Sequence, residues 1–190
     1  MYLKNSLILI LFIILSCQSV EILKPIEIDT TTFEEISINA EQIEVNKKYN
    51  SAFSKSNIED QIQKSPINLM TEWNSQNILK FGNENKLVIN ILDASIIKTE
   101  IMNIGAKKYE ESTIFNYEIS YLVEYELYDS SNFLIANATV ETSRSTTSKK
   151  YISLNETEII ITELLILAMR DYINETKNQL SIYMEDYLIL

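Results

Sequence analysis

The sequence predicts an α+β fold, a two-layer sandwich with two helices on one face of a four-stranded antiparallel sheet. Apolar and polar residues alternate with the period of a strand in four segments, at residues 36–45, 86–101, 116–128 and 133–146. Apolar residues follow the period of a helix in two further segments, at residues 66–81 and from 154 onward. The predicted order is β-α-β-β-β-α, and helices packed on one apolar sheet face bury that face.

The first predicted strand, 36–45, changes phase along its length. Its apolar residues alternate up to Ala40, and from Ile43 the alternation continues one residue out of phase. We expect a bulge or a bend there. Residues 46–65 are polar and predict a solvated excursion with a short helical turn near 58–62, with a contact loop as the alternative.

Ser65 and Pro66 predict where the first helix begins, because serine is favoured at the N-cap and proline at the first helical position. Gly82 is expected just past the C-terminal end of this helix. Trp73 lies on the apolar face of the helix among aliphatic residues. We interpret Trp73 as a core residue, with a ligand-stacking role as the alternative.

The middle of the chain predicts a sheet with one covered face and one solvated face. Strand 86–101 changes phase at Asp93, where we expect a bulge. Strand 116–128 alternates apolar and aromatic residues on one face with mostly charged residues on the other. Residues 129–132 are turn formers, and they lead into the partner strand 133–146.

Ser153 and Glu156 have the spacing of a capping box and predict the start of the last helix. This helix should run for about 30 residues, roughly 45 Å at about 1.5 Å per residue. That length exceeds what a small sheet covers. We therefore expect residues after about Gln179 to bend or to project beyond the sheet.

Composition excludes several classes of function. The chain carries 16 basic and 27 acidic residues, a net charge of −11, which argues against nucleic-acid binding because that binding depends on basic side chains. The chain has no histidine, one cysteine and two glycines. Histidine-dependent catalysis, an internal disulfide and a glycine-rich phosphate loop are therefore excluded. We expect a protein that is not an enzyme and has no metal and no cofactor.

Two groups of residues are candidates for binding. Arg144 lies between Ser143 and Ser145, and an arginine among hydroxyls can hold an anion such as phosphate; a polar strand end is the alternative. A partner-binding surface is the second candidate, with packing within the chain as the alternative. That surface would consist of Tyr183, Met184 and Tyr187.

The N-terminal segment predicts where the protein resides. Lys4 precedes an unbroken apolar stretch from Leu7 to Leu15, which is typical of a signal peptide. At about 14 Å, this stretch is too short for a bilayer core of about 30 Å. We expect a signal peptide at 1–16, a lipidated cysteine and tether at 17–33, and one α+β domain at 34–190.

The order Leu15-Ser16-Cys17 resembles the lipobox of bacterial lipoproteins. The resemblance implies a diacylglycerol on the Cys17 thiol and a further acyl chain, such as palmitate, on its amine. A cleaved signal without lipid and an uncut weak anchor are the alternatives. Because Gln18 and not aspartate follows the cysteine, the resemblance implies the periplasmic face of the outer membrane, with an inner-membrane lipoprotein as the alternative.

The last two thirds of the chain resemble uncharacterised proteobacterial lipoproteins. The resemblance runs through residues 87–95, 142–146, 153–156 and 167–172. The order of elements also resembles transport-accessory lipoproteins, namely the lipopolysaccharide-export plug LptE and the PqiC-like group. This implies a non-enzymatic assembly or transport accessory with an envelope protein partner. The alternative is a lipid or small-molecule binding module with a pocket between the sheet and the long helix; a cavity of several hundred Å³ would favour it.

Overall fold

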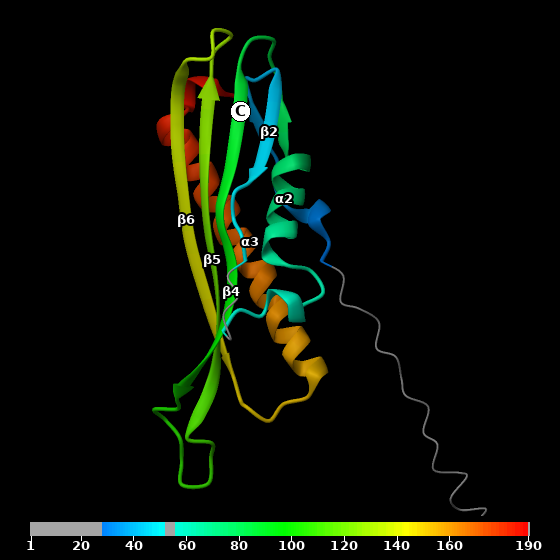
Figure 1. Cartoon of the computed structure of the whole chain (residues 1–190), viewed down its shortest axis with the longest axis vertical. Helices are drawn as coiled ribbons and strands as arrows, with labels where there is room; N and C mark the ends of the chain where they lie inside the picture. Colours follow the sequence, from blue (N-terminus) through cyan, green and yellow to red (C-terminus); the bar gives the residue numbers. More distant parts are fainter. Residues whose placement is uncertain (1–27, 52–55, 190) are drawn as a thin grey trace, which may run out of the picture.

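The structure is a computed structural model, and it describes residues 28–51 and 56–189 (Figure 1). The main sheet has the strand order β2-β4-β5-β6, formed by β2 (Gln42–Lys47), β4 (Lys86–Met102), β5 (Thr113–Tyr128) and β6 (Leu134–Ser148). A small sheet has the order β3-β1-β7, formed by β3 (Ile78–Lys80), β1 (Ile36–Ile38) and β7 (Leu188–Ile189). The α-helices among these residues are α2 (Pro66–Gln76) and α3 (Leu154–Tyr183). Short 3-10 turns are η1 (Thr30–Thr32), η2 (Glu59–Gln61) and η3 (Glu185–Tyr187).

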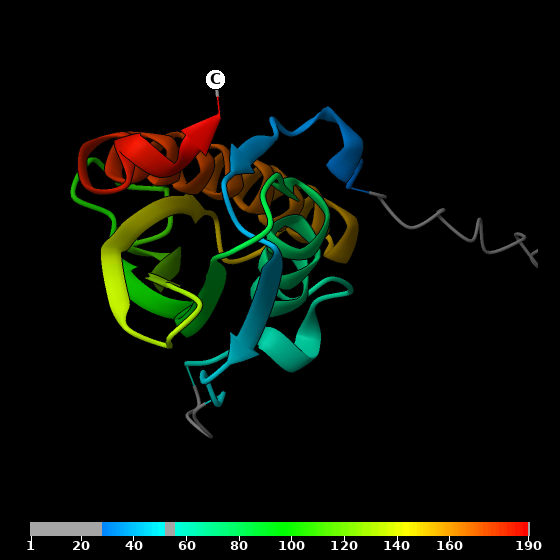
Figure 2. The same cartoon turned by 90° about the horizontal axis from the view of Figure 1, so that it is seen from above.

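The predicted α+β class is confirmed, and both helices lie on one face of the main sheet. Trp73 of α2 and Tyr121 of β5 each contact the ring of Tyr172 of α3, with ring centroids 5.6 Å apart in both pairs. Trp73 is fully buried, which confirms it as a core residue. Figure 2 shows α2 and α3 beside the curved sheet.

The sheet is mixed, and the prediction of a purely antiparallel sheet was wrong. β2 pairs with β4 in parallel, whereas the β4–β5 and β5–β6 pairs are antiparallel. The reason is the connection: α2 lies between β2 and β4, and a strand–helix–strand crossover returns the chain in the same direction.

The phase change in the first predicted strand marks two separate strands in two sheets. β1 belongs to the small sheet and β2 to the main sheet. Ala40 lies between them and is fully buried. The prediction of one strand over residues 36–45 was therefore wrong, because β1 pairs with β3 and β7 whereas β2 pairs with β4.

The first helix begins at Pro66 as predicted, but it ends at Gln76 and not near Gly82. Asn77 caps the end, and its side chain donates a hydrogen bond of 3.1 Å to the carbonyl of Phe33. The following residues form β3 beside β1. Gly82 lies after β3 with φ of 141°, where a side chain would collide with Asn39.

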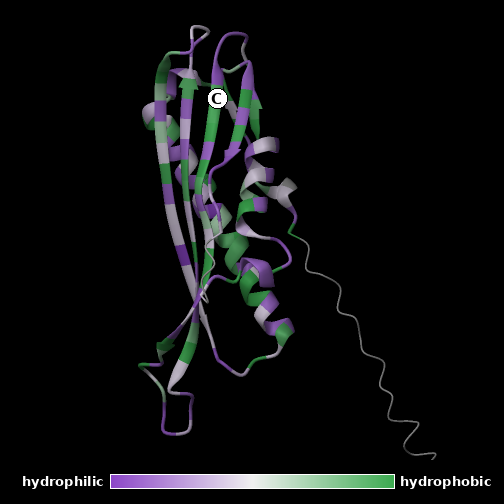
Figure 3. Ribbon diagram, in the orientation of Figure 1, coloured by the Kyte–Doolittle hydropathy of each residue, from purple (hydrophilic) through white to green (hydrophobic). Residues whose placement is uncertain are grey.

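The remaining strands and the start of α3 follow the predictions. The register between β4 and β5 shifts between Ile91 and Asp93, which confirms the bulge. Hydrophobic and hydrophilic residues alternate along the strands (Figure 3). The capping box of Ser153 and Glu156 is formed, and α3 runs for 30 residues. Past α3 the chain turns through η3, and β7 pairs with β1 instead of projecting away.

Candidate functional site

The structure does not bring the three predicted anion-binding residues together. Ser143 and Ser145 are exposed, and Arg144 points to the opposite face of β6, as strand alternation requires. The Arg144 guanidinium binds both carboxylate oxygens of Asp171 on α3, at 2.5 and 3.1 Å. Hydrogen bonding to Asp171 raises the pKa of Arg144. Ser143 instead donates to Glu118 at 3.1 Å.

The three residues predicted as a partner surface are also separated. Tyr183 is 58% exposed, whereas Met184 is 1% exposed and belongs to the core. Tyr187 is half-buried against the core, and its carbonyl accepts a hydrogen bond of 2.7 Å from the amide of Asn39. Met184 is therefore a packing residue, because the turn after α3 folds it inward.

Cys17 and the whole predicted signal peptide lie outside the described residues. In the part that the structure describes, no helix is long and apolar enough to cross a membrane. Thr30 and Phe33, which the sequence assigned to the tether, are 8% and 7% exposed. Thr30 and Phe33 therefore pack on the domain, and Phe33 supplies apolar surface to the core.

A pocket of about 840 Å³ lies between the N-terminal half of α3, the segment that precedes α2, and the inner face of β4 and β5. Figure 1 shows these segments over the lower part of the main sheet. Its apolar lining includes Ile28, Ile58, Ile62, Tyr117, Ile161 and Leu165. Four of these, Ile58, Tyr117, Ile161 and Leu165, are at most 7% exposed.

The pocket forms where the inner face of the sheet stops being wholly apolar. Ala94 and Ile96 point inward from β4 and are fully buried, and Lys98 takes the next inward position, opposite Tyr117 of β5. α2 begins at Pro66, beyond this level of the sheet, so the segment before it covers the pocket instead. That segment is attached to β4 by the bridge between Asn57 and Ile97.

Three lysines line the pocket, and each has a defined position. The ammonium of Lys98 lies 3.8 Å from the ring centroid of Phe115 and 5.6 Å from that of Tyr117. Lys150 forms an ion pair with Glu100 on β4. Lys64 forms an ion pair of 2.7 Å with Glu72 on α2.

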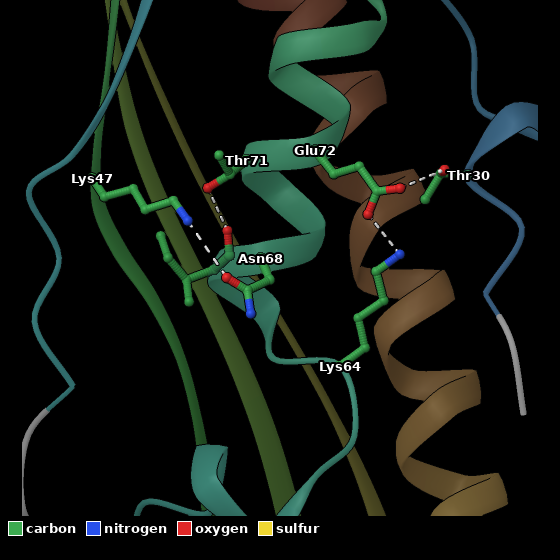
Figure 4. Close-up of polar contacts among 7 residues, drawn as sticks. Thr30, Lys47, Lys64, Asn68, Thr71 and Glu72 are labelled. Atoms are coloured by element: carbon green, nitrogen blue, oxygen red, sulfur yellow. Dashed lines mark hydrogen bonds and ion pairs between the residues drawn. The ribbon is translucent and has the colours of Figure 1, made fainter. Parts of the chain in front are cut away.

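Figure 4 shows the polar contacts between α2 and the segment around Lys64, which forms one wall of the pocket. Glu72 binds Lys64 through one carboxylate oxygen and accepts a hydrogen bond of 3.2 Å from Thr30 through the other. The hydrogen bond from Lys64 lowers the pKa of Glu72. On the other side of α2, Lys47 donates to Asn68 at 3.5 Å. These contacts join the residues around Ile28, the segment before α2 and the helix itself.

Sequence reasoning gave a pocket between the sheet and the long helix as an alternative, but it did not identify the lysines that line the pocket. The signal for Lys98 was present, since a lysine takes an inward position directly after Ala94 and Ile96 on β4. No sequence pattern indicated that Lys64 and Lys150 line a pocket. Both lie outside regular elements, and only the folding of the chain places them in the lining of the same pocket as Lys98. Among residues 28–51 and 56–189, no group of three or more acidic or cysteine side chains is arranged to hold a metal.

No protein-family model matches the chain, and no curated protein matches it in sequence. A minor lipoprotein from Acinetobacter baumannii shares 12% identity with a TM-score of 0.40, over 76% of this chain and 93% of that chain. A structure described as a homolog of a neuraminyllactose-binding hemagglutinin from Helicobacter pylori shares 10% identity with a TM-score of 0.28, over 80% and 91% of the two chains. Both similarities are too distant to transfer a function. Neither names the LptE or PqiC-like group, and that resemblance stays a prediction.

Proposed function

We propose that this chain is a non-enzymatic, lipid-anchored envelope lipoprotein that holds an apolar ligand in the pocket beside α3. The pocket carries the proposal: its volume of about 840 Å³ falls within the range of about 300–1,000 Å³ of small-molecule sites. Apolar and polar side chains share its lining about equally, and removal of the apolar part of a ligand from water would drive binding. The binding module, which the sequence left as the alternative, becomes the favoured function.

A carrier suits the chemistry of the chain better than an enzyme does. The chain has no histidine, and its one cysteine is the predicted lipidation site. The pocket offers lysines, hydroxyls and Glu158 around an aliphatic lining. These groups are sufficient to bind and release a ligand, because a carrier needs no catalytic residue.

Acylation of Cys17 would keep the pocket close to a membrane. Ile28 lines the pocket, and the chain from residue 17 to residue 28 spans at most about 40 Å when fully extended. We place the protein on the periplasmic face of the outer membrane, as the resemblance of the N-terminal segment implies. An apolar ligand could then pass between the pocket and the nearby lipid over a short distance.

Anchoring is tested by Cys17→Ser. We expect this variant to leave the envelope fraction and to appear as soluble protein, because the acyl chains supply the membrane affinity. Mass spectrometry of the native N-terminal peptide should find the diacylglycerol. Unchanged fractionation with the envelope would refute the anchor.

Ligand binding is tested with the neutral apolar fluorophore N-phenyl-1-naphthylamine. We expect one bound fluorophore per chain, and a tenfold or larger loss of affinity in Thr157→Trp, which fills the pocket from α3. Leu167→Trp is the matched control, because Leu167 is exposed on the same helix and does not line the pocket. Equal binding by both variants would place the fluorophore elsewhere and reject the pocket.

A second candidate is a protein-binding role for the tip of the β4–β5 hairpin, which extends past the ends of both helices (Figure 1). Met102, Ile104 and Tyr109 are 78%, 99% and 94% exposed there. An apolar tip of this kind suits a contact with an envelope protein partner. Ile104→Glu should then abolish co-purification of that partner and leave fluorophore binding unchanged.

A further inference from the structure

We infer that the ligand of the pocket is an anionic amphiphile, an aliphatic chain that ends in a carboxylate or a phosphate. This inference rests on the proposed function and adds the chemical class of the ligand. It follows from the position of Lys98, from the ion pairs of the other two lysines and from the mixed lining of the pocket.

The pocket gathers basic side chains although the chain as a whole is acidic. Three lysines and one glutamate, Glu158, line it, whereas the chain carries a net charge of −11. Because Lys64 and Lys150 are paired with Glu72 and Glu100, Lys98 is the lysine of this lining that can attract an anion.

Lys98 is the lysine that is available to a ligand. Lys64 and Lys150 are already paired with Glu72 and Glu100. Within the described residues, the ammonium of Lys98 forms no ion pair and lies over the rings of Phe115 and Tyr117. A half-buried ammonium loses part of its hydration, and an anion within the pocket would compensate that loss.

The pocket lining contains both cationic and aliphatic side chains. Lys98 and Lys150 lie near the ring of Phe115, and their ammonium groups are 3.8 and 5.8 Å from its centroid. Ile58, Ile161 and Leu165 supply the buried aliphatic lining. A ligand with an anionic head and an aliphatic tail has a partner for both kinds of side chain. A sugar phosphate or a nucleotide would leave the aliphatic lining without a partner.

The test compares ligands that share one hexadecyl chain and differ only in the head group. Hexadecanoate, hexadecyl phosphate, hexadecanol and hexadecyltrimethylammonium displace N-phenyl-1-naphthylamine from the detergent-free Cys17→Ser chain, below their micelle concentrations. We expect at least one of the two anions to bind about fivefold or more tightly than the alcohol, as one added ion pair allows. The cation should bind most weakly.

Charge reversal at Lys98 locates the head group. We expect Lys98→Glu to weaken the preferred anion about tenfold and to leave hexadecanol unchanged; Lys98→Gln should lie between it and the wild type. Lys108→Glu is the matched control, because it makes the same charge change on the exposed hairpin and does not line the pocket. Circular dichroism checks that each variant is folded.

The outcomes separate this inference from the proposed function. Equal affinity for anions and alcohol, or equal effects of Lys98→Glu and Lys108→Glu, would overturn the anionic class and leave an apolar carrier. Failure of every ligand and of the fluorophore to bind would reject the pocket itself. Binding of hexadecanoate without hexadecyl phosphate would identify a carboxylate head, and the reverse result a phosphate head; both support the inference.

Discussion

The side-chain oxygen of Asn74 on α2 accepts a hydrogen bond of 2.8 Å from the hydroxyl of Tyr125 on β5. The Tyr172 hydroxyl of α3 donates to the same oxygen at 3.2 Å and also contacts the Tyr125 hydroxyl. All three side chains are fully buried. The contact therefore joins both helices and the sheet in the centre of the core, where an unpaired polar group is costly.

Asn74→Ala should destabilise the protein by about 2 kcal/mol or more, because two buried tyrosine hydroxyls lose their acceptor. Urea unfolding gives the free energy of unfolding. Asn68→Ala is the matched control on the same helix: Asn68 is exposed, and its loss should change stability by less than about 0.5 kcal/mol. Similar effects at both positions would contradict the central role of Asn74.

Tyr121 and Tyr125 should respond in opposite ways to removal of the hydroxyl. Tyr125 is hydrogen-bonded, whereas the buried Tyr121 hydroxyl has no hydrogen-bond partner among the described residues. Tyr125→Phe should cost about 1–2 kcal/mol, and Tyr121→Phe should be neutral or stabilising. Thermal unfolding of the two variants provides the comparison, and a large loss in Tyr121→Phe would reveal a partner for that hydroxyl.

Stability should fall at alkaline pH. Burial raises the pKa of Tyr172 to about 12, and it also raises the pKa of Tyr121 and Tyr125. An unfolded tyrosine loses its proton near pH 10, so between about pH 10 and 12 the folded state binds more protons than the unfolded state. The free energy of unfolding must then decrease as the pH rises through this window.

Urea unfolding from about pH 8 to about pH 11 measures this slope. Tyr172→Phe should show a shallower decline above pH 10, because one of the titrating groups has been removed. A stability that stays constant up to about pH 11 would indicate that these hydroxyls reach solvent.

Met184→Ala and Tyr183→Ala test how the turn after α3 packs on the core. Met184 is 1% exposed and Tyr183 is 58% exposed, although the two are adjacent. Met184→Ala should cost about 2–3 kcal/mol through the cavity it leaves, and Tyr183→Ala less than about 0.5 kcal/mol. The melting temperatures of the two variants measure this difference. A larger loss of stability in Tyr183→Ala than in Met184→Ala would show that Met184 is exposed.

Local patterns in the sequence were sufficient to predict the elements that depend on neighbouring residues. Ser153 and Glu156 place the start of α3, because a capping box involves residues three apart. Pro66 places the start of α2 in the same way. The alternation along β5 identifies its buried face, because side-chain direction repeats every two residues whatever the partner strand.

The features that depend on distant partners could not be predicted from local patterns. β2 runs parallel to β4, α2 ends at Gln76 before its cap Asn77, and Met184 is buried, each because a segment far away in the sequence packs against it. The pocket belongs to the same class, since Lys64, Lys98 and Lys150 come from three separate parts of the chain. Periodicity and capping report the neighbours of a residue along the chain, whereas pairing direction and cavities depend on contacts between segments that the chain brings together only when it folds.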